Sequence, residues 1–386
     1  MSRATRKQAA QAAPPPERAF PPGVGNLRLG NGELARAGAV ASRVAPAHRY
    51  VVITDQTVGA LHLAKLSSGF GDSPLTIVIP PGEGEKNRAR WAEITDRMLD
   101  AGCGRDTTVL ALGGGVIGDL AGFVAATYMR GVPLVQVPTT LLAMVDASVG
   151  GKTAVDVPAG KNLVGAFHPA AAVVADPEVL QTLPVRHARS GVAEMLKHGA
   201  IADPGHFAAV REAAGPLAAR APDEPAGAAM LGLSELIGDS IAIKSAVVAE
   251  DPLETGRRRI LNFGHTVAHA LESASNFTLL HGEAVAIGMV LEARIAEVMG
   301  IARAGTAELI GEALRSVGLP SRLADAGLSQ GISSVELRRW MGSDKKNQDG
   351  AIRFALPKAL GSMEEGDGRW SVSVPESVID EVLEKI

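Results

Sequence analysis

Three stretches in the second half of the chain bring together residue types that bind metal ions. The segment SGVAEMLKHG places Glu194 and Lys197 three residues apart, and so on one face of a helix. RRRILNFGHTVAH places His265 and His269 four residues apart on another helix, and His281 follows in LLHGEAVAIGM. Two histidines with a distant carboxylate can hold zinc and leave one position open for chemistry. Spacing alone favours His265 and His269 as joint ligands; the alternative is two ordinary histidines on an amphipathic helix.

A glycine-rich turn lies in the first half of the chain. GGGVIGD, at 113–119, follows a predicted strand and opens a predicted helix. Glycines there let the backbone approach a pyrophosphate, and the helix N-terminus supplies N–H donors. The turn departs from the usual dinucleotide fingerprint in two ways: it follows the third predicted strand, and no acid lies about 20 residues further on to hold a ribose. A nucleotide site and a plain tight turn are both compatible with it.

Another segment, PTTLLAMVDASVGGKTAVDVPAGKNLVG at 138–165, carries residues suited to binding anions. Thr139 and Thr140 close a predicted strand, where α/β proteins bind ligands. Four polar residues follow in a stretch too rich in glycine for one regular helix: Asp146, Lys152, Lys161 and Asn162. Lysines beside backbone donors suit phosphate or carboxylate. The alternative is a solvated loop with surface lysines.

The elements that position these residues fall into two groups. Nearly all-apolar runs predict buried parallel strands at Tyr50–Thr54, Leu75–Ile79, Thr107–Leu112, Leu134–Val137 and Val173–Ala175. After about Leu183 no further strand is expected, and helical periodicity covers Ser190–Ile201, Leu231–Val248, Gly264–Ser273, Glu283–Met299 and Thr306–Val317, with a loop at Ala213–Ala228. We therefore predict a disordered extension at 1–20, a Rossmann-like α/β domain with a parallel sheet at 21–185, and a mainly α-helical domain at 186–386.

The composition of the chain argues against nucleic-acid binding, disulfide bonding and membrane insertion. The chain has 386 residues and a net charge of −4, which gives no basic field for nucleic acid. Its single cysteine, Cys103, allows no intrachain disulfide, and we expect a cytoplasmic protein. No stretch offers the roughly 18 apolar residues of a membrane span, so no membrane partner is expected.

Taken together, these segments resemble the 3-dehydroquinate synthase family. The matching blocks run in family order from about residue 50 to 357: GGGVIGDLAGFVAATYMRG, VPTTLLAMVDASVGGKTAVD, GKNLVGAFHP, SGVAEMLKHG, RRILNFGHTVAHALE, LLHGEAVAIGM and MGSDKKN. The resemblance changes the expected ligand set, because it implies that Glu194, His265 and His281 bind one divalent metal ion, zinc or cobalt. It implies that His269 instead faces the substrate phosphate and takes part in proton transfer.

The resemblance also implies a reaction. The family converts 3-deoxy-D-arabino-heptulosonate 7-phosphate into 3-dehydroquinate and phosphate, the second step of the shikimate pathway. NAD transiently oxidises the C5 hydroxyl, which acidifies the C6 proton and lets phosphate leave. Re-reduction, ring opening and an intramolecular aldol closure follow. The metal acts as a Lewis acid on the hydroxyl, and the nicotinamide carries the hydride.

Residue roles carry over position by position. The resemblance implies a phosphate site of Arg130, Lys152, Asn162, His269 and Lys345 or Lys346. It implies a carboxylate site of Lys244, Arg258 and Asn262, hydroxyl contacts from Asp146 and Lys197, and proton transfer by Glu254. It implies NAD contacts from Asp55, Glu83, Lys86, Gly114, Gly115, Val116, Gly118, Asp119, Thr139, Thr140, Lys152, Lys161, Val179 and Thr182. Arg130 would come from a partner subunit, so the resemblance implies a homodimer.

Three other functions fit parts of the pattern. A related sugar-phosphate cyclase would make an inosose or a valiolone, but Asp146, Lys152, Asn162, Arg258 and His269 fit the dehydroquinate pattern. A metal-dependent alcohol or polyol dehydrogenase on the same scaffold would have no use for a phosphate-binding lysine cluster. A non-catalytic NAD-binding protein is disfavoured, because competent residues occupy every metal and acid–base position.

Overall fold

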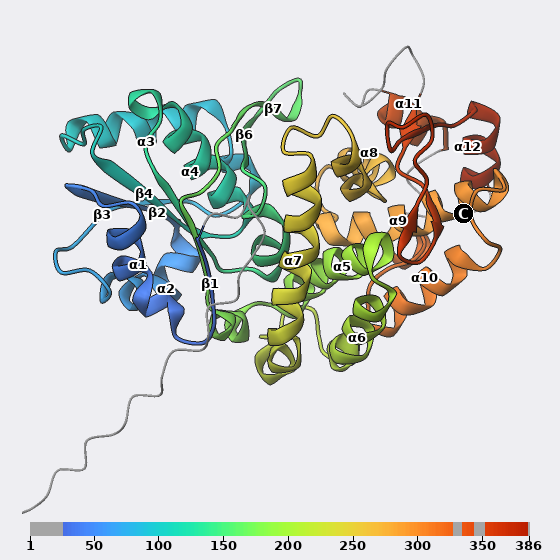
Figure 1. The fold of residues 1–386 in the computed structure, drawn as a ribbon, viewed down its shortest axis with the longest axis horizontal. Coiled ribbons are helices and arrows are strands. Elements are labelled where there is room, and N and C mark those ends of the chain that lie inside the picture. The colour runs from blue at the N-terminus through green and yellow to red at the C-terminus, as the bar shows by residue number, and fades with distance from the viewer. Residues whose placement is uncertain (1–25, 327–333, 343–351, 385–386) are drawn as a thin grey trace, which may run out of the picture.

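The computed structural model of the chain describes residues 26–326, 334–342 and 352–384 (Figure 1). The predicted extension at 1–20 lies outside the described residues, as do Lys345 and Lys346. Among the described helices, none is both long enough and apolar enough to cross a membrane.

A six-stranded parallel sheet forms the first half of the described chain. Its strand order is β1-β8-β5-β4-β2-β3, with β1 at Asn26–Leu29, β8 at Ala172–Ala175, β5 at Leu134–Pro138, β4 at Thr107–Gly113, β2 at Arg49–Asp55 and β3 at Leu75–Ile79. The central strands β4 and β5 are buried along their whole length. Such strands need cover on both faces, which explains their nearly unbroken apolar sequences.

Alternate residues of the sheet belong to two separate cores. On one face, Val52 and Leu110 pack with α1 (Ala37–Val44) and α2 (Gln56–Ser67). On the other face, Ile53 and Val109 pack with α3 (Arg88–Asp100) and α4 (Gly115–Thr127). The strand period of two residues therefore sorts side chains into the two layers of a doubly wound domain.

The segment after β5 departs from this α/β pattern. A π-helix, η4, covers Ala143–Ala147, and an antiparallel hairpin follows with β6 at Lys152–Val157 and β7 at Gly160–Phe167. In Figure 1 the hairpin projects beyond the sheet toward the helical half. Lys152 opens β6, and Lys161 and Asn162 lie near the start of β7.

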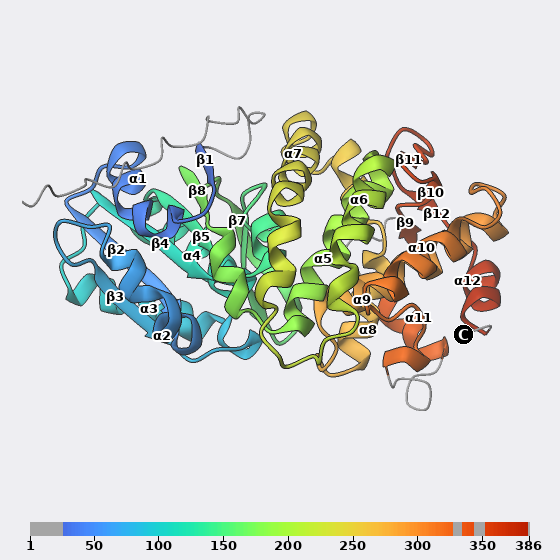
Figure 2. The same ribbon diagram turned by 90° about the horizontal axis from the view of Figure 1, so that it is seen from below.

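The second half is mainly helical. Its helices are α5 (Val185–Ala202), α6 (Pro204–Ala214), α7 (Ser234–Glu250), α8 (His265–Ala274), α9 (His281–Val298), α10 (Thr306–Ser316), α11 (Ser334–Gly342) and α12 (Glu376–Leu383). Figures 1 and 2 show α5 and α7 between the sheet and the other helices. Two small antiparallel pairs lie near the end of the chain, β9 (Arg353–Phe354) with β12 (Val372–Ser373) and β10 (Pro357–Ala359) with β11 (Ser362–Met363).

The fold class predicted from the sequence is confirmed, and the five predicted strands correspond to β2, β3, β4, β5 and β8. Several details were wrong, and the hairpin β6–β7 was not predicted either. The short strand β1 was not expected, so the glycine-rich turn follows the fourth strand of the chain and not the third. Strands do occur after Leu183, as β9–β12, and α6, α11 and α12 were not predicted. The expected loop at Ala213–Ala228 contains the 3-10 turn Gly215–Leu217 and the start of another at Gly227–Leu233.

Candidate active site

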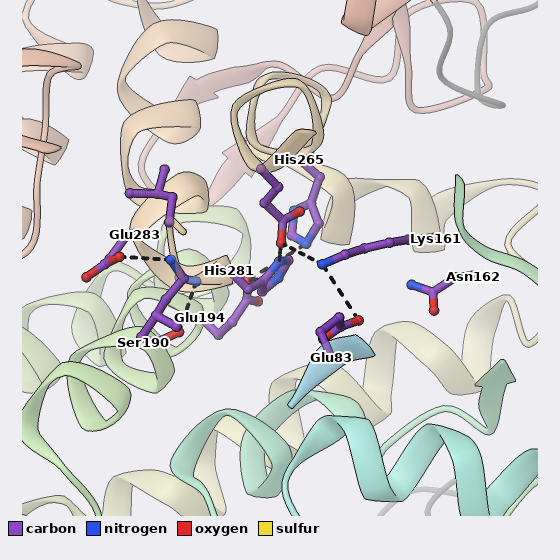
Figure 3. Close-up of polar contacts among 12 residues, drawn as sticks. Glu83, Lys161, Asn162, Ser190, Glu194, His265, His281 and Glu283 are labelled. Carbon is purple, nitrogen blue, oxygen red and sulfur yellow. Dashed lines mark hydrogen bonds and ion pairs between the residues drawn. The ribbon is translucent and has the colours of Figure 1, made fainter. Parts of the chain in front are cut away.

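Three side chains from three helices converge between the two halves of the chain (Figure 3). Glu194 lies in the middle of α5, whereas His265 and His281 are the first residues of α8 and α9. One potential ligand atom from each lies within 4.8 Å of the other two. Glu194 Oε1 is 3.8 Å from His265 Nε2 and 3.6 Å from His281 Nε2, distances too long for hydrogen bonds.

The carboxylate of Glu194 is fully buried, and Oε1 accepts no hydrogen bond from any described residue. Lys197, one turn further along α5, forms an ion pair with Oε2. Burial opposes ionisation, but the Lys197 ammonium outweighs it and holds the pKa of Glu194 below its usual value. A buried, ionised oxygen that faces two imidazole nitrogens matches the donor set of a divalent zinc-type site.

The two histidines of this group are oriented through their other ring nitrogens. His281 Nδ1 lies 3.5 Å from Glu272 Oε1, and His265 Nδ1 lies 3.2 Å from the carbonyl oxygen of Phe263. Burial alone would lower the pKa of His281, but contacts with Glu194 and Glu272 raise it to about 10. A proton must therefore leave His281 before its Nε2 can bind a metal ion.

His269 occupies a different place from the one that helical spacing suggested. Its ring lies edge-on to His265, with ring centroids 5.7 Å apart. It belongs to none of the potential metal-binding groups among the described residues. The geometry thus supports the ligand set implied by the family resemblance over the His265–His269 pair.

A second polar group adjoins the first. Lys244 on α7 donates to Oδ1 and to the carbonyl oxygen of Asp146, at 2.5 and 2.6 Å. Although burial opposes it, this pairing with Lys244 and the charge of Lys197 hold the pKa of Asp146 far below its usual range. His198 Nε2 lies 3.9 Å from the same Oδ1, and its Nδ1 lies 2.7 Å from Ser240 Oγ. Burial, reinforced by Lys197, lowers the pKa of His198 to about 3, so its imidazole is neutral.

A third group joins the hairpin to the loop before α8. Lys152 forms an ion pair with Glu254, and Asn262 Nδ2 donates to the other oxygen of Glu254 at 2.6 Å. Arg258 is 2% exposed and donates to the carbonyl oxygens of Pro252 and Gly150 at 2.5 and 3.0 Å. The structure thus brings together Lys152 and Asn262, to which the resemblance gave substrate contacts, and Glu254, to which it gave proton transfer.

Apart from Lys152 and Lys161 on the hairpin, the predicted nucleotide residues lie where the strands of the sheet end or just after them. A Cβ atom on Gly114 would lie 3.1 Å from Thr140 Cγ2, and one on Gly118 would lie 3.0 Å from Gln136 Oε1. Thr140 Oγ1 accepts from Ala143 N at 3.1 Å, and Thr182 Oγ1 lies 3.3 Å from His62 Nε2. This edge of a parallel sheet is where open α/β folds bind ligands.

Lys86 is the centre of a charged cluster at the same edge. It is 4% exposed, and its Nζ lies 2.9 Å from Glu83, 3.3 Å from Asp119 and 2.9 Å from Asn162 Oδ1. Burial raises the pKa of Asp119 to about 6, although Lys86 opposes the shift. Lys161 lies 3.6 Å from Glu83 and 3.7 Å from Glu272, so it links this cluster to the metal-competent group (Figure 3).

Two other predicted substrate residues are Asn162, on β7, and Arg130, just after α4. Asn162 meets Lys86 of the nucleotide cluster, where the resemblance had grouped it with the phosphate residue Lys152. Arg130 is exposed just after α4 and forms no ion pair with the described residues. Lys345 and Lys346 fall outside the described residues.

Sequence reasoning missed two polar residues of the site. His198 lies four residues after Glu194, and Glu272 lies three after His269, so both share helix faces with predicted residues. That spacing was the available signal. It was weak, because the contacts of Glu272 with His281 and Lys161 are tertiary.

The fold and this site are those of a class of enzymes. In this class, a parallel sheet of the kind that binds nucleotides lies beside helices whose side chains can hold a metal ion. Family models for the N-terminal and C-terminal parts of 3-dehydroquinate synthase match residues 76–190 and 191–347. The chain belongs to the 3-dehydroquinate synthase family and is an enzyme of that family.

Similar proteins agree with this assignment. The 3-dehydroquinate synthase of Symbiobacterium thermophilum is 43% identical over 342 residues, covering 87% of this chain and 92% of the relative. That of Geobacter metallireducens is 43% identical over 339 residues, covering 87% and 90%.

Solved structures show the same fold. A 2-deoxy-scyllo-inosose synthase with carbaglucose-6-phosphate, NAD+ and Co2+ has a TM-score of 0.81 at 26% identity, covering 94% of this chain and 96% of the other. The 2-epi-5-epi-valiolone synthase of Streptomyces hygroscopicus, with NAD+ and Zn2+, has a TM-score of 0.80 at 26% identity, covering 100% and 99%. A probable glycerol dehydrogenase from Sinorhizobium meliloti, at 17% identity with a TM-score of 0.60, shares the fold alone over 95% of this chain and 97% of its own.

Proposed function

We propose that this chain converts 3-deoxy-D-arabino-heptulosonate 7-phosphate into 3-dehydroquinate and phosphate, the second step of the shikimate pathway, with NAD and one divalent metal ion. The observation that carries the proposal is the meeting of Glu194, His265 and His281 beside a set of buried lysines. A metal-competent group next to ammonium groups suits a substrate with both hydroxyls and anionic groups.

The metal ion is zinc or cobalt, held by Glu194, His265 and His281. Two observations support this ligand set: Oε1 of Glu194 is buried, and the Nε2 atoms of His265 and His281 both face it. When bound, the ion supplies Lewis-acid chemistry that makes a substrate hydroxyl more acidic. Lys197 keeps Glu194 ionised, and with Asp146 it suits the substrate hydroxyls.

NAD occupies the carboxyl edge of the sheet. β5 and η4 approach the glycine-rich turn closely, and no side chain of the N-cap residue Gly114 caps the first N–H groups of α4. Such a helix start suits a pyrophosphate. Bound NAD supplies reversible hydride transfer. The proposed contacts are Asp55, Glu83, Lys86, Gly114, Gly115, Val116, Gly118, Asp119, Thr139, Thr140, Lys152, Lys161, Val179 and Thr182.

The substrate anions bind to polar and cationic side chains, two of which, Lys152 and Lys244, the structure pairs with carboxylates. Lys152, Asn162, His269 and Lys345 or Lys346 take the phosphate, with Arg130 from a second copy of the chain. Lys244, Arg258 and Asn262 take the carboxylate. A phosphate group that engages Lys152 competes with Glu254 for this ammonium group. Glu254 then becomes a better proton acceptor, which fits its proposed role in proton transfer.

Three broader features accompany this function. We propose a homodimer, supported by the exposed position of Arg130. We propose a cytoplasmic location, consistent with a single buried cysteine. We propose a nucleotide domain at 21–185 and a metal and substrate domain at 186–386, a division close to the boundary between the two family models at 190 and 191.

The test is to supply the heptulosonate phosphate with NAD and zinc and to assay phosphate and dehydroquinate together. We expect equal amounts of the two products, and no phosphate from glucose 6-phosphate. Lys152→Gln should lower kcat/KM roughly 10–100-fold, the worth of a charged hydrogen bond. Lys358→Gln, on the distant strand β10, is the matched control and should leave kcat/KM unchanged. Phosphate release without dehydroquinate would contradict the proposed function.

A further inference from the structure

A buried carboxylate, that of Glu292, lies outside the metal-competent group of Glu194, His265 and His281. Glu292 lies on α9, three turns after His281, and none of its surface is exposed. Its Oε2 accepts a hydrogen bond from the backbone N–H of Gly264 at 2.7 Å. Its Oε1 accepts from the N–H groups of Thr266 and Val267 at 3.0 and 3.2 Å. His265 lies between the donors.

The first backbone N–H groups of α8 require hydrogen-bond acceptors, and Glu292 supplies them. Gly264, the N-cap residue, has a left-handed φ of 84°, and no side chain of its own caps the helix. The first N–H groups of a helix have no acceptor within the helix. Here they are buried, since Thr266 is 3% and Val267 1% exposed. A carboxylate from a neighbouring helix satisfies these donors, and the positive end of the helix dipole favours its charge.

The backbones around this cap are in direct contact. A Cβ atom on Gly288 of α9 would lie 2.0 Å from the carbonyl oxygen of Gly264, so α8 begins against bare backbone. At the start of α9, a Cβ atom on Gly282 would lie 2.1 Å from the carbonyl oxygen of Ser190. Ser190 Oγ also accepts from Gly282 N at 2.9 Å, one turn before Glu194. The starts of α8 and α9 and the Glu194 turn of α5 are thus packed into one unit.

We propose that Glu292 is a positioning residue for the metal site: its carboxylate fixes the backbone on both sides of His265 and so sets where this ligand meets Glu194 and His281. The inference rests on the proposed function of those three residues as metal ligands. Glu292 does not touch the metal position. It acts through His265, and its loss should loosen one ligand while the other two remain in place.

The same helix supplies a matched control. Glu297 of α9 accepts from Ala307 N at 2.9 Å, at the start of α10. The N-cap residue of α10 is again a left-handed glycine, Gly305, with φ 90° and no side-chain cap. Glu297 therefore makes the same kind of contact as Glu292, but α10 carries none of the proposed site residues.

The experiment compares Glu292→Gln with Glu297→Gln in the full-length protein. In Glu292→Gln the side chain keeps one acceptor oxygen and turns its NH2 group toward a backbone N–H. In Glu297→Gln the oxygen can stay on Ala307 N, and the NH2 group then faces Arg294. Zinc dissociation constants come from competition with a chelating dye, and cobalt-loaded protein reports ligand geometry through its visible absorption. We expect Glu292→Gln to weaken zinc binding about 10–100-fold, as the loss of a supporting contact does, and to shift the cobalt bands. We expect Glu297→Gln to stay within about twofold, because distant sites act independently.

The outcomes separate this inference from the proposed function. Failure of the wild-type protein to bind zinc would overturn the proposed metal site itself. Normal wild-type binding with an unchanged Glu292→Gln protein would overturn only the role of Glu292, as would an equal loss in both variants. If Glu292→Gln does not fold, Glu292→Asp and hydrogen exchange of the metal-free wild type decide the question. The cap predicts protected amides at Thr266 and Val267 before zinc is added, and unprotected amides there would refute it.

Discussion

The different roles proposed for His265 and His269 give a sharp test of the site. We predict that His265→Ala loses its metal ion, whereas His269→Ala keeps it and loses turnover. His265 Nε2 faces Glu194 Oε1 at 3.8 Å in a group with His281, and His269 is outside that group. The two residues lie one turn apart on α8, so the variants differ little in helix propensity or location.

The expected magnitudes follow from the geometry. A four-ligand structural zinc site is worth about 10–16 kcal/mol, or roughly 3–4 kcal/mol for each ligand. Loss of His265 should therefore weaken zinc binding by roughly 10²–10³-fold. The ring of His269 touches that of His265 only edge-on, at 5.7 Å between centroids. An edge-to-face contact is worth about 0.5–1.5 kcal/mol, so His269→Ala should weaken zinc binding roughly tenfold at most.

The assay is metal content after dialysis against a weak chelator, followed by competition titration of zinc. Turnover of the zinc-loaded variants is measured in parallel. Equal metal loss from the two variants would refute this account of the site, and would restore the pair suggested by helical spacing. Full turnover by zinc-loaded His269→Ala would remove this residue from the chemistry.

Three further predictions concern the metal, the Lys244–Asp146 ion pair and the hydrogen bonds of Asp251. Prolonged chelation should abolish activity, and zinc or cobalt should restore it; full activity without metal would contradict the ligand set. Lys244→Met should lower the free energy of unfolding by about 3–5 kcal/mol in urea titrations, because it leaves Asp146 charged and unpaired; a neutral effect would contradict the pairing. Despite burial, backbone donors lower the pKa of Asp251, which accepts from Arg258 N at 3.1 Å. The stability from this contact should be present above the ordinary aspartate pKa of about 4 and lost as pH falls through the lower folded value. Asp251→Asn should therefore cost about 1–3 kcal/mol at neutral pH and less in acid, and a cost independent of pH would refute the argument.

The sequence was most informative about strands that are buried on both faces. The runs at β2, β4 and β5 are nearly all apolar because helices cover the sheet on both sides. The short edge strand β1 escaped notice because its four residues, NLRL, are half exposed and alternate in character. The hairpin β6–β7 escaped for a related reason: Gly160, Lys161 and Asn162 read as a loop, and β7 is mostly exposed.

The site was predictable only in part from spacing. Helical periodicity places His265 near His269, but it says nothing of His281, sixteen residues further on. His281 approaches His265 because the start of α8 packs against the interior of α9, with Gly264 against Gly288. Glu292 gave no sequence signal, since a glutamate on a helix is ordinary until the fold buries it beneath another helix. The family resemblance supplied the proposed ligand set, which local spacing could not.

The most direct test of the central claim is a count of redox equivalents. Substrate and product of the proposed reaction have the same oxidation level, so a hydride given to NAD must return to the same molecule within one turnover. With NAD at a small fraction of the substrate concentration, we expect complete conversion to dehydroquinate. The concentration of NADH should never exceed that of the enzyme. NADH that grows in proportion to product would identify an ordinary dehydrogenase and contradict the account.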